Sequence, residues 1–283
     1  MTTLARSARP TPAVGQLLRE WRERRRISQL DLSIQADISA RHLSFVETGR
    51  SRPTADMILR LSDQLEVPLR ERNALLLAGG YAPAYPEHSL DEPELARLRV
   101  ALRQILTGHE PYPALVVNRW WEMLDGNAAV AVLIDGCDHA LLAPPVNALR
   151  VSLHPDGMAS RIANLPEWRA HILERLHRQV QATLDPRLAE LLAELSSYPG
   201  GEAERPELTD VAVPLRLRHD GNELAFFSMT AVVGAPLDVT VAEVAIESFY
   251  PADAATAEAL QAIVELDLDL LADIEPPRGF GRD

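Results

Sequence analysis

The sequence contains no lysine and a single cysteine, Cys137, among its 283 residues. One cysteine cannot form an internal disulfide or a cysteine-rich zinc cluster, so we expect Cys137 to be a small, partly buried apolar residue. No stretch approaches the roughly 20 consecutive apolar residues of a membrane-spanning helix, and the N-terminus lacks the apolar segment of a signal peptide. These absences argue against a disulfide-stabilised secreted protein and a membrane protein, and they favour a cytoplasmic one.

The net charge of −13 is divided unevenly along the chain. Residues 1–80 contain 13 Arg against 9 Asp and Glu, a net charge of +4, whereas residues 81–283 contain 15 Arg against 32 Asp and Glu, a net charge of −17. Positive charge concentrated in one part of a chain is typical of a phosphate-binding surface. The acidic remainder would be repelled by DNA. With 47% hydrophobic residues, the chain is long enough to form two folded domains.

Five helices are expected between residues 14 and 80, after a flexible tail at 1–13. Ser28 and Ser39 precede the second and third helices as N-cap residues, and Asp31 follows Ser28 as in a capping box. Gly49 is placed to end the third helix. Helical spacing of apolar residues and these end signals predict helices at 14–25, 29–36, 40–48 and 70–78, with a fourth in chain order between Pro53 and Pro68.

The second and third helices are predicted to form a helix-turn-helix, with Asp37 in the left-handed conformation that a tight turn requires. The residues that would pack these two helices together are Leu32, Ala36, Ile38, Leu43 and Val46. Their burial leaves the opposite face of the third helix exposed, and a helix presented in this way fits the DNA major groove, which is about 12 Å wide. That exposed face carries Ala40, Arg41, Ser44 and Phe45.

Each residue of this surface has an expected contact. Arg41 can bond the O6/N7 edge of guanine, and Ala40 or Phe45 can touch a thymine methyl group. Gln29, at the start of the second helix, and the two arginines after the third helix, Arg50 and Arg52, can bind phosphate. A plain helical bundle with solvated arginines is the alternative.

Residues 14–78 resemble the Cro/C1-type helix-turn-helix (xenobiotic-response-element family). The resemblance rests on three blocks, Ile27-Ser28-Gln29-Leu30-Asp31-Leu32, Ile38-Ser39-Ala40-Arg41-His42-Leu43 and Glu47-Thr48-Gly49-Arg50. It implies base contacts from the exposed face of the third helix and a phosphate contact from Gln29. The sequence departs from the common pattern at Asp37, where glycine is frequent, and at Ser33, where alanine is frequent. The full predicted DNA-binding set is Gln29, Ser39, Ala40, Arg41, Ser44, Phe45, Arg50 and Arg52.

A linker is expected at 81–92, a second domain at 93–275 and a flexible tail at 276–283. The apolar pattern predicts helices at 93–107, 127–133, 166–183, 186–196 and 254–274. Extended segments are predicted at 113–125, 211–218, 224–233 and 238–250, with Asp220-Gly221 as a hairpin turn. The fold class is therefore α+β, an all-α N-terminal domain followed by a domain of strands and helices.

From Gly79 onward the chain resembles the MmyB-like family of regulators. The resemblance rests on blocks in the same order, namely residues 69–79, 118–127, 147–157, 226–230 and 247–253. It implies a PAS-like ligand-binding domain, in which helices pack over one face of an antiparallel sheet. It also implies a homodimer, which we expect to bind a palindromic DNA operator.

Large apolar residues of the second domain are the candidates for a ligand pocket, which is mostly apolar with a few polar groups. Packing in the core is the alternative role for each of them. We expect a small, mainly hydrophobic ligand whose acidic head group pairs with an arginine such as Arg119 or Arg150. The predicted ligand-binding set is Arg119, Trp121, Leu124, Asn127, Arg150, Phe226, Phe227 and Met229, with His154 as a further polar candidate. A domain that serves only as a dimerisation scaffold is the competing hypothesis.

No enzyme activity and no cofactor are expected. The sequence lacks a Gly-x-Ser-x-Gly elbow, a phosphate-binding loop and a dinucleotide glycine fingerprint. His171, Glu174 and His177 are spaced three apart on one predicted helix, but this spacing turns the two histidines about 120° apart, so a solvated helix face is favoured over a metal site. The acidic run Glu265, Asp267, Asp269 and Asp273 is likewise predicted to be solvated surface.

Overall fold

The computed structural model describes residues 13–201, 203 and 212–272, with side chains of the last helix described as far as residue 263. The described residues form two compact units, one of residues up to 88 together with 235–242, and one of residues 89–234 together with those from 243 onward. The expected tail at 276–283, and the expected tail at 1–13 except for its last residue, lie outside the described residues. No helix in the part of the chain that the structure describes is long and apolar enough to cross a bilayer.

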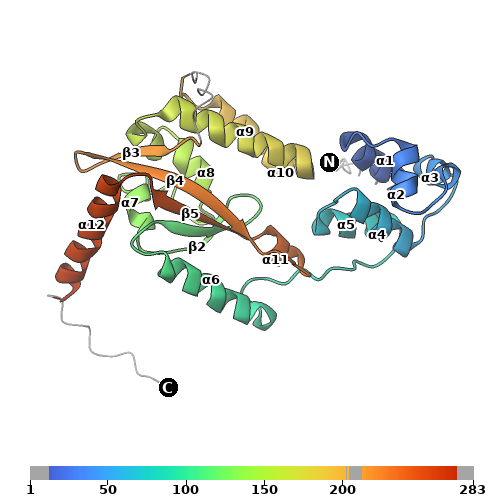
Figure 1. Ribbon diagram of the computed structural model, residues 1–283, viewed down its shortest axis with the longest axis horizontal. Coiled ribbons are helices and arrows are strands. Elements are labelled where there is room, and N and C mark those ends of the chain that lie inside the picture. The colour runs from blue at the N-terminus through green and yellow to red at the C-terminus, as the bar shows by residue number, and fades with distance from the viewer. Residues whose placement is uncertain (1–12, 202, 204–211, 273–283) are drawn as a thin grey trace, which may run out of the picture. The chain divides into compact units, whose positions relative to one another are not determined.

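The five predicted N-terminal helices are confirmed (Figure 1). Ser28 Oγ accepts a hydrogen bond from the Asp31 backbone N at 3.1 Å, and Ser39 Oγ accepts one from the His42 backbone N at 3.1 Å, so both serines cap their helices as expected. Asp37 takes a left-handed φ of 51°, which makes the tight turn that glycine usually provides. The helices are α1 (Val14–Arg24), α2 (Gln29–Gln35), α3 (Ala40–Glu47), α4 (Ala55–Gln64) and α5 (Leu69–Ala78).

A buried ion pair joins α1 to α3 beneath the apolar core of this unit. Arg22 Nε donates to Glu47 Oε1 at 2.7 Å, and Arg22 Nη2 donates to Glu47 Oε2 at 2.9 Å. The Glu47 side chain is only 1% exposed, so its charge depends on this partner. The surrounding apolar core includes the predicted contact residues of the second and third helices, with Leu32, Ala36, Leu43 and Val46 buried and Ile38 packed against them.

A five-stranded antiparallel sheet forms the centre of the C-terminal unit, in the order β2-β1-β5-β4-β3. Asp220 and Gly221, with φ values of 47° and 78°, make the predicted hairpin turn between β3 and β4. The antiparallel sheet and the α+β fold class that the sequence predicts are confirmed. The strands are β1 (Ala114–Val117), β2 (Met123–Gly126), β3 (Leu215–His219), β4 (Asn222–Val232) and β5 (Ala245–Pro251).

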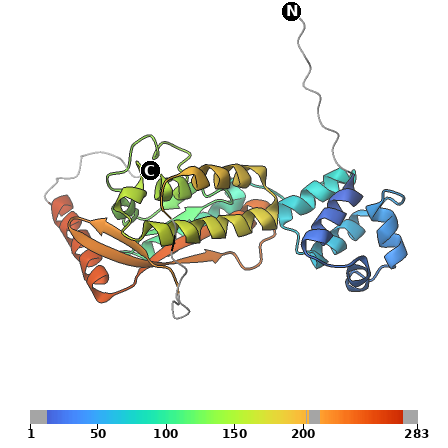
Figure 2. The ribbon, with the colours of Figure 1, turned by 90° about the horizontal axis from the view of Figure 1, so that it is seen from above.

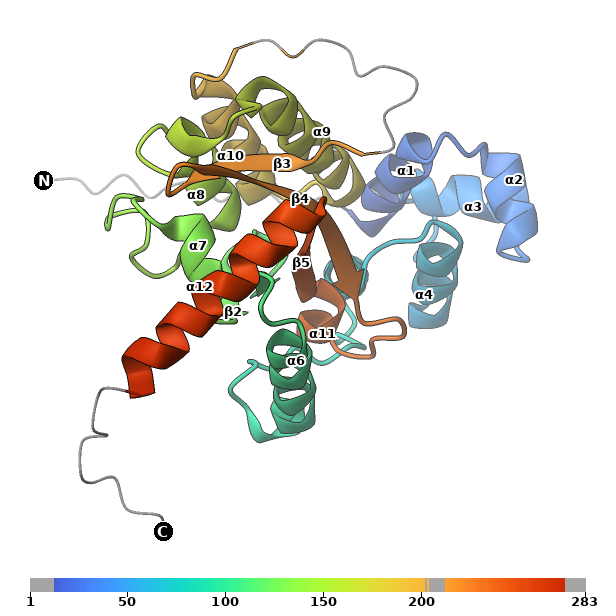
Figure 3. The same ribbon diagram turned by 60° about the vertical axis from the view of Figure 1, so that its left-hand side comes forward.

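Helices cover both faces of the sheet, not only one. The larger core lies between the sheet and α7, α8, α9 and α10, and Figure 2 shows α9 and α10 running side by side. On the opposite face, α6 buries Leu102 and Leu106 against β1 and β5. The last helix packs against β4 (Figure 3). The helices are η1 (Pro93–Leu95), α6 (Ala96–Gly108), α7 (Val130–Ile134), α8 (Ala148–Leu153), η2 (Met158–Arg161), α9 (Leu165–Thr183), α10 (Pro186–Ser197), α11 (Val239–Glu243) and α12 (Ala254–Ala272).

Two predicted extended segments are corrected by the structure. Residues 113–125 form two strands, because Asn118 Oδ1 accepts hydrogen bonds from the Trp120 and Glu122 backbone N atoms and closes a tight turn between them. Residues 238–250 begin with a helix, because Asp238 Oδ1 accepts a hydrogen bond from the Val241 backbone N and caps α11. In both places a polar side chain redirects a backbone whose apolar pattern indicates a strand.

We predict that Glu47→Ala destabilises the N-terminal unit by about 3–5 kcal/mol, since the buried Arg22 guanidinium loses both of its hydrogen bonds to the Glu47 carboxylate. Hydrogen exchange of the α1 and α3 amides in the full chain measures this loss. The matched control is Arg19→Ala, which removes an exposed ion pair with Glu23, leaves both carboxylate contacts of Arg22 in place and should cost far less. Equal losses in the two variants would contradict a structural role for the buried pair.

Candidate functional site

The exposed face of α3 presents two arginines around one aromatic ring. Arg41 is exposed, and its guanidinium carbon lies 5.3 Å from the centre of the Phe45 ring, while that of Arg50 lies 6.0 Å from the same ring. No carboxylate pairs with either arginine within the described residues. The two cations are therefore available to an anionic partner, and Phe45 limits how far their side chains move.

Three other members of the predicted DNA-binding set are held by intramolecular bonds. Gln29 Nε2 donates to Glu47 Oε2 at 2.7 Å, which ties it to the buried ion pair, and Ser39 caps α3. Arg52 Nη2 donates to the Gly79 carbonyl at 2.8 Å and its guanidinium carbon lies 5.8 Å from the centre of the Tyr81 ring. The structure thus separates Arg52, which fastens the end of α5, from Arg50, which projects from the loop after α3.

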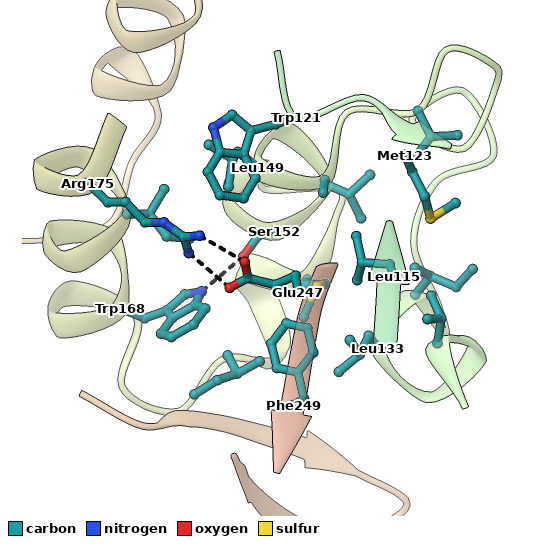
Figure 4. Close-up of a pocket in the computed structure, with 18 of the residues that line it drawn as sticks. Leu115, Trp121, Met123, Leu133, Leu149, Ser152, Trp168, Arg175, Glu247 and Phe249 are labelled. Carbon is teal, nitrogen blue, oxygen red and sulfur yellow. Dashed lines mark hydrogen bonds and ion pairs between the residues drawn. The ribbon is translucent and has the colours of Figure 1, made fainter. Parts of the chain in front are cut away.

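A cavity of about 70 Å³ lies in the larger core of the C-terminal unit. Its walls come from β1, β5, α7, α8 and α9, so residues far apart in the sequence meet there (Figure 4). Most of the lining is aliphatic or aromatic. The polar side chains on it are Ser152, His171, Arg175 and Glu247.

An ion pair forms one wall of this cavity. Arg175 Nη1 and Nη2 donate to Glu247 Oε1 and Oε2 at 2.9 and 2.8 Å, and Figure 4 shows the two side chains meeting from α9 and β5. Thr230 Oγ1 also donates to Glu247 Oε2 at 2.9 Å. The guanidinium carbon of Arg175 lies 4.3 Å from the centre of the Trp121 ring. The Glu247 side chain is 8% exposed, so its carboxylate is desolvated and depends on the arginine.

Trp121 holds its place on the cavity wall through an unusual backbone. Its φ of 65° is left-handed, a conformation that is costly for a large side chain. The indole Nε1 donates to Gln179 Oε1 at 2.8 Å, and Gln179 Nε2 donates in turn to the Arg119 carbonyl at 2.8 Å. The turn after β1 and the side of α9 therefore fix this ring over Arg175.

His171 is the polar group of the cavity with the most bonding capacity left. Its ring stacks on Trp168, with 5.5 Å between ring centres, and no hydrogen bond reaches its ring nitrogens within the described residues. Burial, and then the nearby Arg175 charge, lower the pKa of His171, so the imidazole is neutral at neutral pH. Ser152 Oγ, by contrast, already accepts a hydrogen bond from Trp168 Nε1 at 3.0 Å.

Of the eight residues predicted to bind ligand, the structure places only Trp121 on this cavity. Phe226 is fully buried in the core, while Phe227 and Met229 point to the opposite face of the sheet, where they are exposed. Leu124 lines a separate groove beside α6. The expectation of one shared pocket is corrected because neighbouring strand residues alternate between faces.

The predicted polar candidates have structural partners elsewhere. Arg119 pairs with Asp185 at 3.2 Å and with Glu243 at 2.5 Å, and Arg150 makes a two-bond pair with Glu194 at 2.6 and 2.8 Å. Asn127 accepts from the Ala114 backbone N and donates to two backbone carbonyls. His154 packs edge-on against Tyr198. The expected acid-binding arginines are therefore neutralised outside the cavity.

One stripe of α9 supplies the cavity residues that sequence reasoning missed. The spacing of 168, 171, 172 and 175 places them on one helical face, and this spacing was the available signal. The prediction of a solvated face was wrong for His171, which lines the cavity, whereas Glu174 and His177 are exposed. The side chains of Glu265, Asp267, Asp269 and Asp273 lie outside the described residues.

Comparisons with known proteins agree with this architecture. The family model "MmyB-like transcription regulator ligand binding domain" matches residues 98–263, more than half of the chain, and the chain belongs to this family. A helix-turn-helix domain model matches residues 13–75. The chain thus has the domain composition of a DNA-binding transcription regulator, and both matched domains are of regulatory type.

Among solved structures, the chain is similar to one titled "Structure of an RNA-binding Light-Oxygen-Voltage Receptor", at 13% sequence identity and a TM-score of 0.26. The match covers 93% of this chain and 63% of that one. Comparison with curated protein sequences gives no significant match.

We predict that Arg41→Ala weakens binding to the specific DNA site by about 1–3 kcal/mol and relaxes the preference at one base pair, since an exposed arginine on α3 is placed to bond a guanine edge. Selection of binding sites from a randomised DNA pool, followed by titration, measures both effects. An unchanged base preference would show that Arg41 contacts no base.

We predict that Arg50→Ala weakens binding to specific and non-specific DNA alike and lowers the slope of log affinity against log salt by about 1. Arg52→Ala serves as the matched control, because the Arg52 side chain is bonded to Gly79 and should leave that slope unchanged. Fluorescence anisotropy over a salt series gives both slopes. The assignment of Arg50 to a phosphate fails if the two variants behave alike.

Proposed function

We propose that this protein is a sequence-specific DNA-binding transcription regulator whose C-terminal domain senses a small, mainly hydrophobic molecule. The observation that carries the proposal is the partly enclosed apolar cavity in the core of that domain, on the same chain as a helix-turn-helix with two unpaired arginines on its exposed face. The protein would act in the cytoplasm, where the DNA it binds is located.

The cavity supports a ligand site because protein interiors are otherwise closely packed. An empty cavity costs roughly 24 cal/mol per Å³, so one of about 70 Å³ costs about 2 kcal/mol in stability. Larger side chains at aliphatic positions of the lining would remove that cost. A ligand that binds in the cavity stabilises the folded domain, and a sensor needs such a response to its ligand.

A dimerisation scaffold without a ligand is the second candidate, and exposed apolar residues favour it. Phe227, Met229 and Tyr250 lie on the face of the sheet opposite the cavity, with 39%, 61% and 42% of their surfaces exposed. Exposed apolar groups of this kind are common at protein interfaces. The two candidates make different demands on the cavity. A sensor must bind a ligand there, whereas a scaffold needs none.

Within the N-terminal unit, hydrogen bonds connect residues 235–242 to residues 84–88 and these to α5. Residues 235–242, which connect β4 to α11 and β5, belong to this unit. The Val239 backbone N donates to the Pro86 carbonyl at 2.8 Å, and His88 Nδ1 lies 2.8 Å from Asp238 Oδ2. The segment at 84–88 is also bonded to α5, because Asn73 Oδ1 on that helix accepts hydrogen bonds from the Ala84 and Tyr85 backbone N atoms. The segment between β4 and β5 is thus bonded to residues 84–88, and these residues are bonded to α5.

We expect a two-fold symmetric dimer on a palindromic operator, since one recognition helix contacts too few base pairs for useful specificity. The half-site centres should lie about 34 Å apart, or a multiple of that distance, which corresponds to one turn of DNA. Sedimentation of the DNA complex and footprinting test both parts. A footprint without an inverted repeat, or full affinity as a monomer, would contradict the dimer.

We predict that protein purified from cells retains a small apolar molecule, detectable by native mass spectrometry, and that Ile172→Trp does not retain it. Ile172 is 4% exposed and lines the cavity, so the larger indole occupies the ligand volume. The control is Ile105→Trp on the exposed surface of α6, which should retain the molecule. Circular dichroism establishes that both variants are folded. Retention by the filled variant would favour the scaffold candidate.

A further inference from the structure

The charge on the polar wall of the cavity is already balanced. Arg175 is the only arginine among the described residues that line the cavity, and Glu247 occupies both of its terminal nitrogens. Trp121 covers one face of the guanidinium. Glu247 occupies the edge formed by the two terminal nitrogens, and Nη2 also donates to Thr230 Oγ1, so that edge is closed to a second carboxylate.

An anionic ligand would therefore meet one of two penalties. If its carboxylate displaces Glu247 from Arg175, the Glu247 carboxylate is left buried without a cation. If it binds beside the pair, it lies next to a carboxylate of the same charge in a region of low dielectric constant. Neither arrangement gains a cation that the unliganded protein does not already use.

An uncharged polar group meets no such penalty, and His171 offers it a partner. The neutral imidazole can donate one hydrogen bond and accept another, and both nitrogens are unbonded within the described residues. Arg175 and Glu247 remain paired when such a group binds. The rest of the lining is apolar and suits a hydrocarbon or aromatic body.

We propose that this cavity selects an uncharged ligand, whose apolar body fills the core and whose hydroxyl, carbonyl or amide group bonds to His171. The inference rests on the proposed function, because it presumes that the cavity binds a ligand. It replaces the acidic head group expected from the sequence, since Arg119 and Arg150 have carboxylate partners elsewhere.

The test compares alcohols with carboxylates of the same skeleton. The probes are propan-1-ol against propanoate and butan-1-ol against butanoate, chosen short because the cavity is about 70 Å³, at about pH 8, where both acids are ionised. Binding to the full chain, stripped of any retained molecule, is followed by calorimetry and by the fluorescence of the tryptophans that line the cavity. We expect at least one alcohol to bind at least about tenfold more tightly than its carboxylate.

Two charge variants separate selection by the ion pair from the general hydrophobicity of the probes. Glu247→Gln leaves the Arg175 charge unbalanced, so it should strengthen carboxylate binding by about tenfold or more and change alcohol binding little. Glu194→Gln frees Arg150 in the same manner outside the cavity and should change neither. If Glu247→Gln does not fold, the comparison of probes on the unaltered protein still decides.

The outcomes distinguish the inference from the proposed function. Tighter binding of the carboxylates to the unaltered protein would overturn the uncharged ligand while leaving a sensor in place. A Glu247→Gln variant that binds carboxylates no better than Glu194→Gln would also overturn it. If none of the four probes binds, while the cavity-filled Ile172→Trp variant retains the same molecules as the unaltered protein, the ligand site itself is refuted.

Discussion

The ion pair between Arg175 and Glu247 joins helix α9 to strand β5 and forms the polar wall of the C-terminal cavity. The Glu247 side chain is 8% exposed and that of Arg175 is 23% exposed, so both lose hydration when the helix packs on the sheet, and the Glu247 charge is costly without its partner. The pair therefore fixes the register of α9 against β5, and with it the positions of Trp168, His171 and Trp121 around the cavity. The shape of the cavity and the balance of charge on its wall both depend on this contact.

The same constraint applies to the two arginines that are buried among the described residues of this lysine-free chain. Arg22 is paired with Glu47 in the helix-turn-helix unit, and Arg119 is paired with Asp185 and Glu243 in the C-terminal unit. An arginine such as Arg119, which the sequence suggests as a partner for an acidic ligand, is therefore already paired with carboxylates of the protein. Arg41 and Arg50, by contrast, have no carboxylate partner within the described residues and are exposed, so a charged partner can approach them from solvent.

Local signals explain why much of the fold was predictable from sequence. Ser28 and Ser39 cap their helices through hydrogen bonds to residues only three positions further along the chain. The turn at Asp220-Gly221 depends only on the left-handed φ of these two residues. The cavity was not predictable in this way, because Arg175 and Glu247 are separated by 72 residues. The left-handed Trp121 likewise has no signal in its own sequence, since its backbone is imposed by Asn118 and its side chain is held by α9. The resemblance of the sequence to the MmyB-like family identified the family, but it did not show which aromatic residues line the cavity.

A regulator whose C-terminal domain senses a ligand couples ligand binding to DNA binding. A ligand shifts the protein between two arrangements only by its difference in affinity for them, and the coupling must be reciprocal. The most direct measurement is the affinity of the retained molecule for the protein with and without saturating operator DNA. We predict that operator DNA changes the affinity for the molecule by the same factor by which the molecule changes the affinity for operator DNA. Equal ligand affinity in the two titrations would contradict it.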